Sequence, residues 1–137
     1  MPKVYTGKVV IPGNKIDEYI KMLMEAEKER EPFVRYASEL NQAFVEHLFR
    51  EGYSGRTVDK HSSIVHWFID FLARHTDVWK FEEVTIGIAN THFKKWFGGK
   101  IVCSYTQDDV RVALTKFFKF LAEEKGIVNE KVLKGLR

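Results

Sequence analysis

The amino-acid sequence predicts an all-α protein, a single bundle of helices. Apolar residues recur at intervals of three and four over most of the 137 residues, which places them on one face of a helix. Capping residues and glycines separate these stretches, whereas the period-two pattern of a strand occurs only near the N-terminus. Hydrophobic residues make up 45% of the chain and charged residues 30%, a balance typical of one globular domain with its own core.

The first part of the chain predicts an extended arm followed by a helix. Residues 1–13 alternate loosely and end at Pro12-Gly13, so we expect a short strand or arm, whose partner the sequence does not identify. Asn14 is a suitable N-cap for a helix over residues 14–31, which Pro32 should end. Its inward face would consist of Ile16, Tyr19, Ile20, Leu23 and Met24, and its charged end, residues 25–31, would face solvent.

Two further helices are predicted before residue 76. The first covers residues 38–50, with Leu40, Phe44 and Leu48 facing inward, and Gly52 closes it. After a turn at Ser54-Gly55, the second covers residues 56–75. Its core positions are Val58, Val65, Phe68, Phe71 and Leu72.

The C-terminal half predicts three more helices. A loop over residues 76–83 leads to a helix at 88–97, which Gly98-Gly99 should break. The last long helix begins after Ser104 or Thr106, has Asp108 and Asp109 near its positive end, and stops at Gly126. Asn129 caps a short tail helix over residues 130–136.

Composition limits the compartment and the partners. The net charge is +3, because 22 basic residues are nearly matched by 19 acidic ones, a weaker excess than a dedicated nucleic-acid binder carries. A single cysteine, Cys103, allows no disulfide within the chain and suits a reducing compartment. The apolar runs are too short for a signal peptide or a membrane span, so we expect a soluble, cytoplasmic protein without membrane contact.

The sequence offers no arrangement typical of catalysis or metal binding. It contains no glycine-framed nucleophile and no glycine-rich phosphate loop. His61 and His66 are five residues apart, whereas two ligands on one helix face need a spacing of three or four. We therefore expect no catalytic residue, no metal and no cofactor.

Polar residues on the helices at 56–75 and 107–125 are of the types that contact DNA phosphates. Such residues also form the solvent-facing side of any amphipathic helix, so both interpretations remain open at this point. The residues concerned are Arg56 and Lys60 on the first helix, and Arg111, Thr115, Lys116 and Lys119 on the second.

Two segments together resemble the core-binding domain of the tyrosine recombinases, the phage integrase family. The first is Arg56-Thr57-Val58 followed by Phe68 and Phe71-Leu72. The second is Thr106, then Ala113-Leu114 and the run Phe117-Phe118-Lys119-Phe120-Leu121. The resemblance covers residues 36–127, which leaves 1–35 as an arm with an extra helix and 128–137 as a tail helix or linker.

The resemblance implies a SAM-like four-helix bundle that clamps duplex DNA with its second and fourth helices, here 56–75 and 107–125. It implies a non-catalytic DNA-binding module whose partners are double-stranded DNA and either a C-terminal catalytic domain in a longer protein or other recombinase protomers. The contacts carried over are Arg56, Thr57, Lys60, Ser63, Arg111, Thr115, Lys116 and Lys119.

The sequence departs from the family at several positions. His61 stands at the family's tyrosine position, and Asp108 and Asp109 stand where the family is neutral or basic. These acidic residues weaken the attraction to phosphate that dominates DNA affinity. The family's reaction also needs a catalytic domain beyond about residue 137, so we expect no catalysis from this chain. The alternative function is a helical protein-interaction or structural domain that kept the fold without binding DNA.

Overall fold

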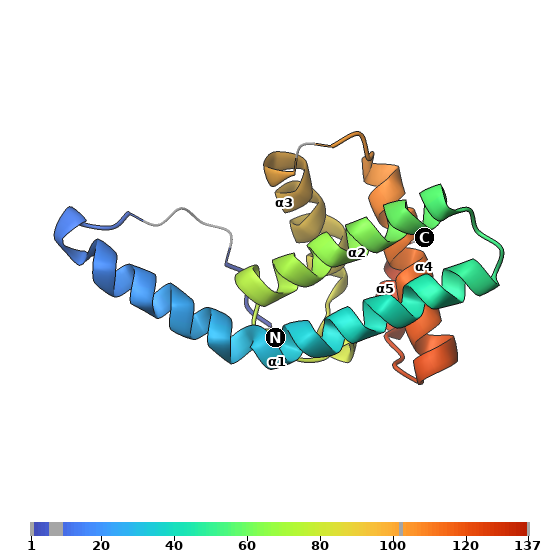
Figure 1. Cartoon of the computed structure of the whole chain (residues 1–137), viewed down its shortest axis with the longest axis horizontal. Helices are drawn as coiled ribbons and strands as arrows, with labels where there is room; N and C mark the ends of the chain where they lie inside the picture. The colour runs from blue at the N-terminus through green and yellow to red at the C-terminus, as the bar shows by residue number, and fades with distance from the viewer. Residues whose placement is uncertain (1, 6–9, 102, 137) are drawn as a thin grey trace.

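All regular structure in the described residues is helical, which confirms the predicted all-α bundle. The computed structural model describes residues 2–5, 10–101 and 103–136. Within them no strand forms, and the only β-type contact is one isolated bridge. Figure 1 shows the α-helices, which are α1 (Ile16–Arg50), α2 (Gly55–His75), α3 (Phe93–Lys100), α4 (Gln107–Lys125) and α5 (Glu130–Gly135). No described helix is both long enough and apolar enough to cross a membrane.

The first long helix does not stop at Pro32, so the prediction of two separate helices was wrong. α1 continues through Pro32 and unites the predicted extra helix with the first core helix. Proline has no N–H to donate to the carbonyl of Lys28, four residues before it. Because Lys28 and Pro32 are both exposed, water can bond that carbonyl. Asn14 does not cap this helix either. It lies inside a 3₁₀ turn, η1 (Gly13–Lys15), and makes no side-chain cap.

The N-terminal half of α1 projects beyond the bundle, as Figure 1 shows in blue. The buried residues of α1 begin only at Phe33. The predicted inward face at Ile16, Ile20, Leu23 and Met24 is therefore exposed, contrary to expectation. These residues do share one face of a helix, but no other described element reaches far enough to cover that face.

The N-terminal arm touches the far end of α2. Val4 forms an antiparallel bridge with Thr76, and the Tyr5 N–H donates to the His75 carbonyl at 2.5 Å. Residues 2–5 are thus extended, as predicted, with a partner that the sequence pattern did not reveal. The rest of the predicted arm lies partly outside the described residues, at 1 and 6–9.

Capping residues define the ends of α2, α4 and α5, and those at Gly126 and Asn129 are the ones that the sequence predicts. The Ser54 side chain accepts from the Thr57 N–H at the start of α2, and Asn129 accepts from Val132 at the start of α5. Gly126 ends α4 in the left-handed region at φ 69°, where a side chain would be strained. Gly52, two residues after the end of α1, also lies in the left-handed region, at φ 89°.

The segment between α2 and α4 is more helical than predicted. A 3₁₀ turn, η2 (Phe81–Glu83), lies in the predicted loop, and a π-helical segment, η3 (Gly87–His92), leads into α3. The glycine pair does not break this helix, because α3 continues to Lys100. Neither Gly98 nor Gly99 has positive φ, so both fit helical backbone at a cost in propensity alone.

Phenylalanines from α1, α2, η2, α3 and α4 meet in the core. Phe81 of η2 is fully buried and lies against Phe33 of α1 and Phe117 of α4, with ring centroids 5.9 and 5.3 Å apart. Phe68 of α2 packs edge-on against Phe93 at 5.0 Å. The short η2 turn therefore joins α1 and α4 through one aromatic side chain.

Candidate nucleic-acid interface

The N-terminal end of α2 presents one exposed cation and a capped turn. Arg56 is exposed and forms no ion pair with any described residue. The Thr57 hydroxyl accepts from Ser54 Oγ at 3.1 Å, and the Thr57 N–H donates to the same Ser54 oxygen. The Ser54 hydroxyl is thus engaged in the cap, whereas the Thr57 hydroxyl accepts there and donates to no described residue. Ser63, two turns farther on, is half-buried.

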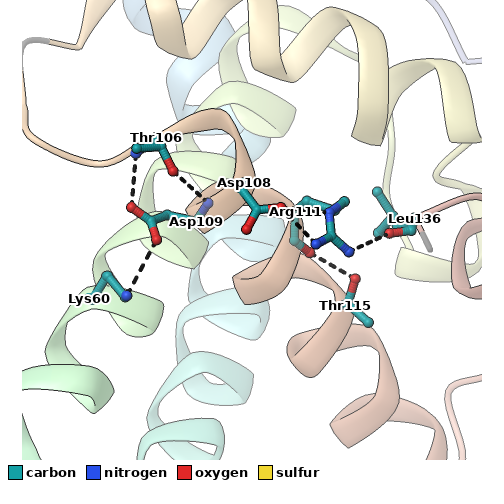
Figure 2. A network of polar contacts seen from close by, with 7 residues as sticks. All are labelled: Lys60, Thr106, Asp108, Asp109, Arg111, Thr115 and Leu136. Atoms are coloured by element: carbon teal, nitrogen blue, oxygen red, sulfur yellow. Dashed lines mark hydrogen bonds and ion pairs between the residues drawn. The ribbon is translucent and has the colours of Figure 1, made fainter.

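Lys60 is paired across to α4. Its ammonium lies 3.4 Å from Asp109 Oδ1, as Figure 2 shows. Asp109 also accepts from the Thr106 N–H at 2.9 Å. This main-chain hydrogen bond lowers the pKa of Asp109, and Lys60 lowers it further, against the opposing effect of partial burial. Part of the charge on Lys60 is therefore neutralised within the protein.

Arg111 and Thr115 bond to α4 itself and to the residue after α5, and the described structure gives neither residue a hydrogen bond or ion pair with α2. The Arg111 guanidinium donates to Asp108 at 2.7 Å and to the Leu136 carbonyl at 3.5 Å (Figure 2). The Thr115 hydroxyl donates to the Arg111 carbonyl at 2.7 Å. The structure thus separates these two residues from the predicted contacts on α2. Lys119, one turn after Thr115, is exposed.

Lys116 is held by a neutral group. Its ammonium donates to the Tyr53 hydroxyl at 2.6 Å and lies 4.7 Å from the centre of the Tyr53 ring. Within the described part of the chain it has no carboxylate partner. Tyr53 is in the turn before α2, so this contact ties the turn to the middle of α4. The result is an oriented, half-buried cation with its charge uncompensated by a nearby anion.

His61 is buried next to Tyr53, the residue that holds this cation. The side chain is 3% exposed and its Nδ1 is buried without a hydrogen-bond partner in the described structure. Its ring is edge-on to Tyr53, with centroids 6.4 Å apart. Burial lowers the pKa of His61, and the nearby charges of Lys116 and Lys60 lower it further, with Asp109 opposing them. The neutral imidazole is thus the favoured form in the folded protein.

Together, Arg56, Lys60 and Lys116 form a basic edge where the start of α2 meets α4. We call these three residues the α2–α4 edge. The sequence did not predict the roles of Tyr53, Asp109 and His61 in this cluster. The Asp108–Arg111 pair has the helical spacing of three that could have been recognised. Tyr53 and Lys116 are separated by 63 residues, and no local pattern indicates such a contact.

The described residues include no group of three histidine, cysteine or acidic side chains placed to hold a metal ion. Cys103 is exposed, in the connector before α4.

Comparison of the chain with protein-family models, with curated proteins and with solved structures gives no match.

Proposed function

We propose that this protein is a non-catalytic module that binds the phosphate backbone of duplex DNA through the α2–α4 edge. The observation that carries the proposal is the contact between Lys116 and Tyr53. A lysine held by a neutral hydroxyl is already oriented and keeps its full charge for an anionic partner. The recombinase resemblance supports the proposal, because it implicates the same two helices.

Arg56 and Lys60 each have a separate reason to bind a phosphate. Arg56 lies in the first turn of α2, where main-chain N–H groups and the helix dipole also favour an anion. Lys60 would exchange Asp109 for a phosphate, and a pair this exposed, with 34% and 29% of the side chains accessible, is worth only about 1 kcal/mol.

Three phosphate contacts per molecule imply weak, salt-sensitive binding. Neutralising about three phosphates gives a slope of roughly −2 to −3 in a plot of log affinity against log salt concentration. Contacts to the backbone carry little base information, so the binding should depend little on sequence.

The test is fluorescence anisotropy with a labelled duplex of about 30 base pairs at several salt concentrations. We expect the double variant Arg56→Gln with Lys116→Gln to lose at least tenfold in affinity and to flatten the salt slope by about two. The matched control is Lys80→Gln with Lys131→Gln, which removes the same charge from the residue before η2 and from α5 and should change the affinity by less than threefold. Equal losses in both variants would mean that only net charge matters, and absence of binding at low salt would overturn the proposal.

A second candidate function is protein–protein interaction without DNA contact. The observation that favours it is the exposed apolar surface on the N-terminal half of α1, together with the internal pairing of Lys60 and Arg111. A protein that ignores DNA at low salt and associates through α1 would fit this candidate.

A further inference from the structure

The N-terminal half of α1 carries an apolar surface that no described residue covers. We call Ile16, Ile20, Leu23 and Met24, which lie within about 100° of one another around the helix, the α1 stripe. These side chains are between 45% and 56% exposed. Ile16, Ile20 and Leu23 follow one another at intervals of four and three, which is the spacing of a helix that pairs with another helix.

An exposed helix of this kind is unfavourable on its own. Isolated segments of this length are marginally stable in water. Four half-exposed side chains offer on the order of 350 Å² per molecule, so two such surfaces together bury about 700 Å², which is in the range of weak interfaces below about 1,200 Å². The area therefore suits a weak pairing of two α1 stripes.

α2 packs along one face of α1 and ends before it reaches the α1 stripe. A helix that covers the stripe would therefore lie in line with α2. Arg74, in the last turn of α2, is 3.9 Å from Glu27 of α1, and Arg30 donates to the Leu72 and Ala73 carbonyls. α2 thus covers α1 only from about Glu27 onward. Leu23 precedes Arg30 by seven residues, which places it on nearly the same side of the helix. The α1 stripe is a continuation of the face that α2 covers.

A helix that continues the line of α2 would run antiparallel to α1 over residues 16–27, about 18 Å. Figure 1 shows α1 and α2 running in opposite directions along this face. The N-terminal end of the added helix would meet the C-terminal end of α2, and the two helix dipoles would then attract.

We propose that the occupant is α1 of a second copy of this chain, paired antiparallel about a two-fold axis near residues 21–22. Such pairing removes the apolar surface of both molecules from water, because each α1 stripe covers the other. In this register, Ile16 of one copy lies at the end of α2 of the other copy. Ile20 of one copy then lies opposite Leu23 of the other.

Charge complementarity supports the same register. Asp17 and Lys28 are 11 residues apart, three turns of helix, so they lie on the same flank of α1. Antiparallel pairing brings that flank against itself. Asp17 of each copy then lies within one turn of Lys28 of the other, twice per dimer.

The first test is sedimentation equilibrium of the full chain between about 5 and 500 μM. We expect the wild-type protein to form dimers with micromolar affinity, and Ile20→Glu with Leu23→Glu to weaken this at least thirtyfold. Both side chains are exposed, so circular dichroism should show that the bundle still folds. The matched control is Phe49→Glu with Val128→Glu, two exposed apolar residues elsewhere, which should associate as the wild type does. A wild-type protein that stays monomeric throughout, or an equal loss in the control, overturns the proposal.

The second test distinguishes antiparallel self-pairing from other association. In a Cys103→Ser background, Ile20→Cys and Leu23→Cys proteins are mixed and oxidised. We expect the mixed disulfide to exceed either homodimer at least fivefold. Predominant homodimers joined at Leu23→Cys would indicate parallel pairing and would overturn this arrangement.

Discussion

Arg30 joins α1 to the C-terminal end of α2 with a single guanidinium group. It donates at 3.2 Å to both the Leu72 and the Ala73 carbonyls and also bonds the Val78 carbonyl. Its carbon Cζ lies 4.7 Å from the Phe33 ring centre and 4.6 Å from that of Trp79. Burial lowers the pKa of Arg30, and the negative charges of Asp77 and Glu83 oppose the shift. Arginine remains charged nonetheless, and its planar fork suits several carbonyls at once.

Replacing Arg30 by methionine should destabilise the fold by about 2–4 kcal/mol. The variant leaves carbonyls at the end of α2 without their donor and removes two cation–π contacts. The free energy of unfolding from urea denaturation is the measurement. Arg35→Met on the same helix is the control, because its exposed pair with Glu31 should contribute less than about 1 kcal/mol. Equal effects of the two substitutions would contradict this role.

His61 makes the stability depend on pH in a direction that follows from its environment. Its pKa is lowered in the folded protein, whereas in the unfolded chain it has the ordinary value of about 6.5. Below that value the unfolded chain takes up a proton that the folded protein resists. The stabilisation is thus complete above pH 6.5 and is lost as the pH falls through the folded-state value.

We expect His61→Phe to remove this pH dependence. The wild type should lose up to about 2 kcal/mol more stability than the variant between pH 7 and pH 5, the limit for one histidine that stays neutral when folded. Urea denaturation at each pH gives the comparison. His66→Phe, at an exposed position of the same helix, is the control and should keep the wild-type dependence. A wild type and His61→Phe with parallel pH profiles would refute the assignment.

At the scale of elements, the sequence predicted helix ends best where the chemistry is local. Ser54, Thr106 and Asn129 cap helices because a side-chain oxygen accepts from a main-chain N–H three residues on. Gly126 ends α4 for an equally local reason, its positive φ.

The predictions of helix ends and of buried faces were wrong where packing against other elements, rather than local sequence, determines them. Pro32 and the pair Gly98-Gly99 disfavour helix locally, but flanking turns packed on the core continue the helix through them. Phe33 and Phe97 are both buried, and each anchors its helix next to the unfavourable residue. The inward face predicted for residues 16–24 failed because a periodic pattern shows an apolar face without showing what covers it.

Two glycine substitutions test this difference between elements. Gly99→Ala should stabilise the protein by about 0.5–1 kcal/mol, because Gly99 is helical and a methyl group there meets no atom within 4 Å. Gly126→Ala should destabilise it by about 1 kcal/mol, because its φ of 69° strains any side chain. Melting temperatures measured by circular dichroism give both signs. A destabilising Gly99→Ala would mean that α3 ends before this residue.

On the scale of the whole molecule, α1 has a supported half and an unsupported half. Amide hydrogen exchange should reflect this, because local opening is easiest where few buried contacts form. At low micromolar concentration we expect residues 18–26 to exchange at least a hundredfold faster than residues 37–48. Raising the protein concentration should protect residues 18–26 selectively if the α1 stripes pair. Uniform protection along α1 at the lowest concentration would contradict the division.

The basic edge was predictable in composition but not in geometry. The sequence identified Arg56, Lys60 and Lys116 as residue types that bind phosphate. It could not show that Asp109 neutralises Lys60 from 49 residues away, or that Tyr53 holds Lys116. Such contacts depend on how α2 packs on α4, and periodicity within either helix does not encode the distance between them.

The continuity of α1 through Pro32 has a geometric consequence. Its buried half fixes the rotation of the projecting half about the helix axis, because no flexible joint separates them. One residue inserted between Met24 and Phe33 would turn Ile16 and Ile20 by about 100° around the axis, and the remainder of the bundle would not change. An insertion of seven residues would nearly restore the direction while moving the tip outward by about 10 Å. The number of residues between the buried half of α1 and its projecting half therefore determines the direction in which the apolar face of the projecting half points.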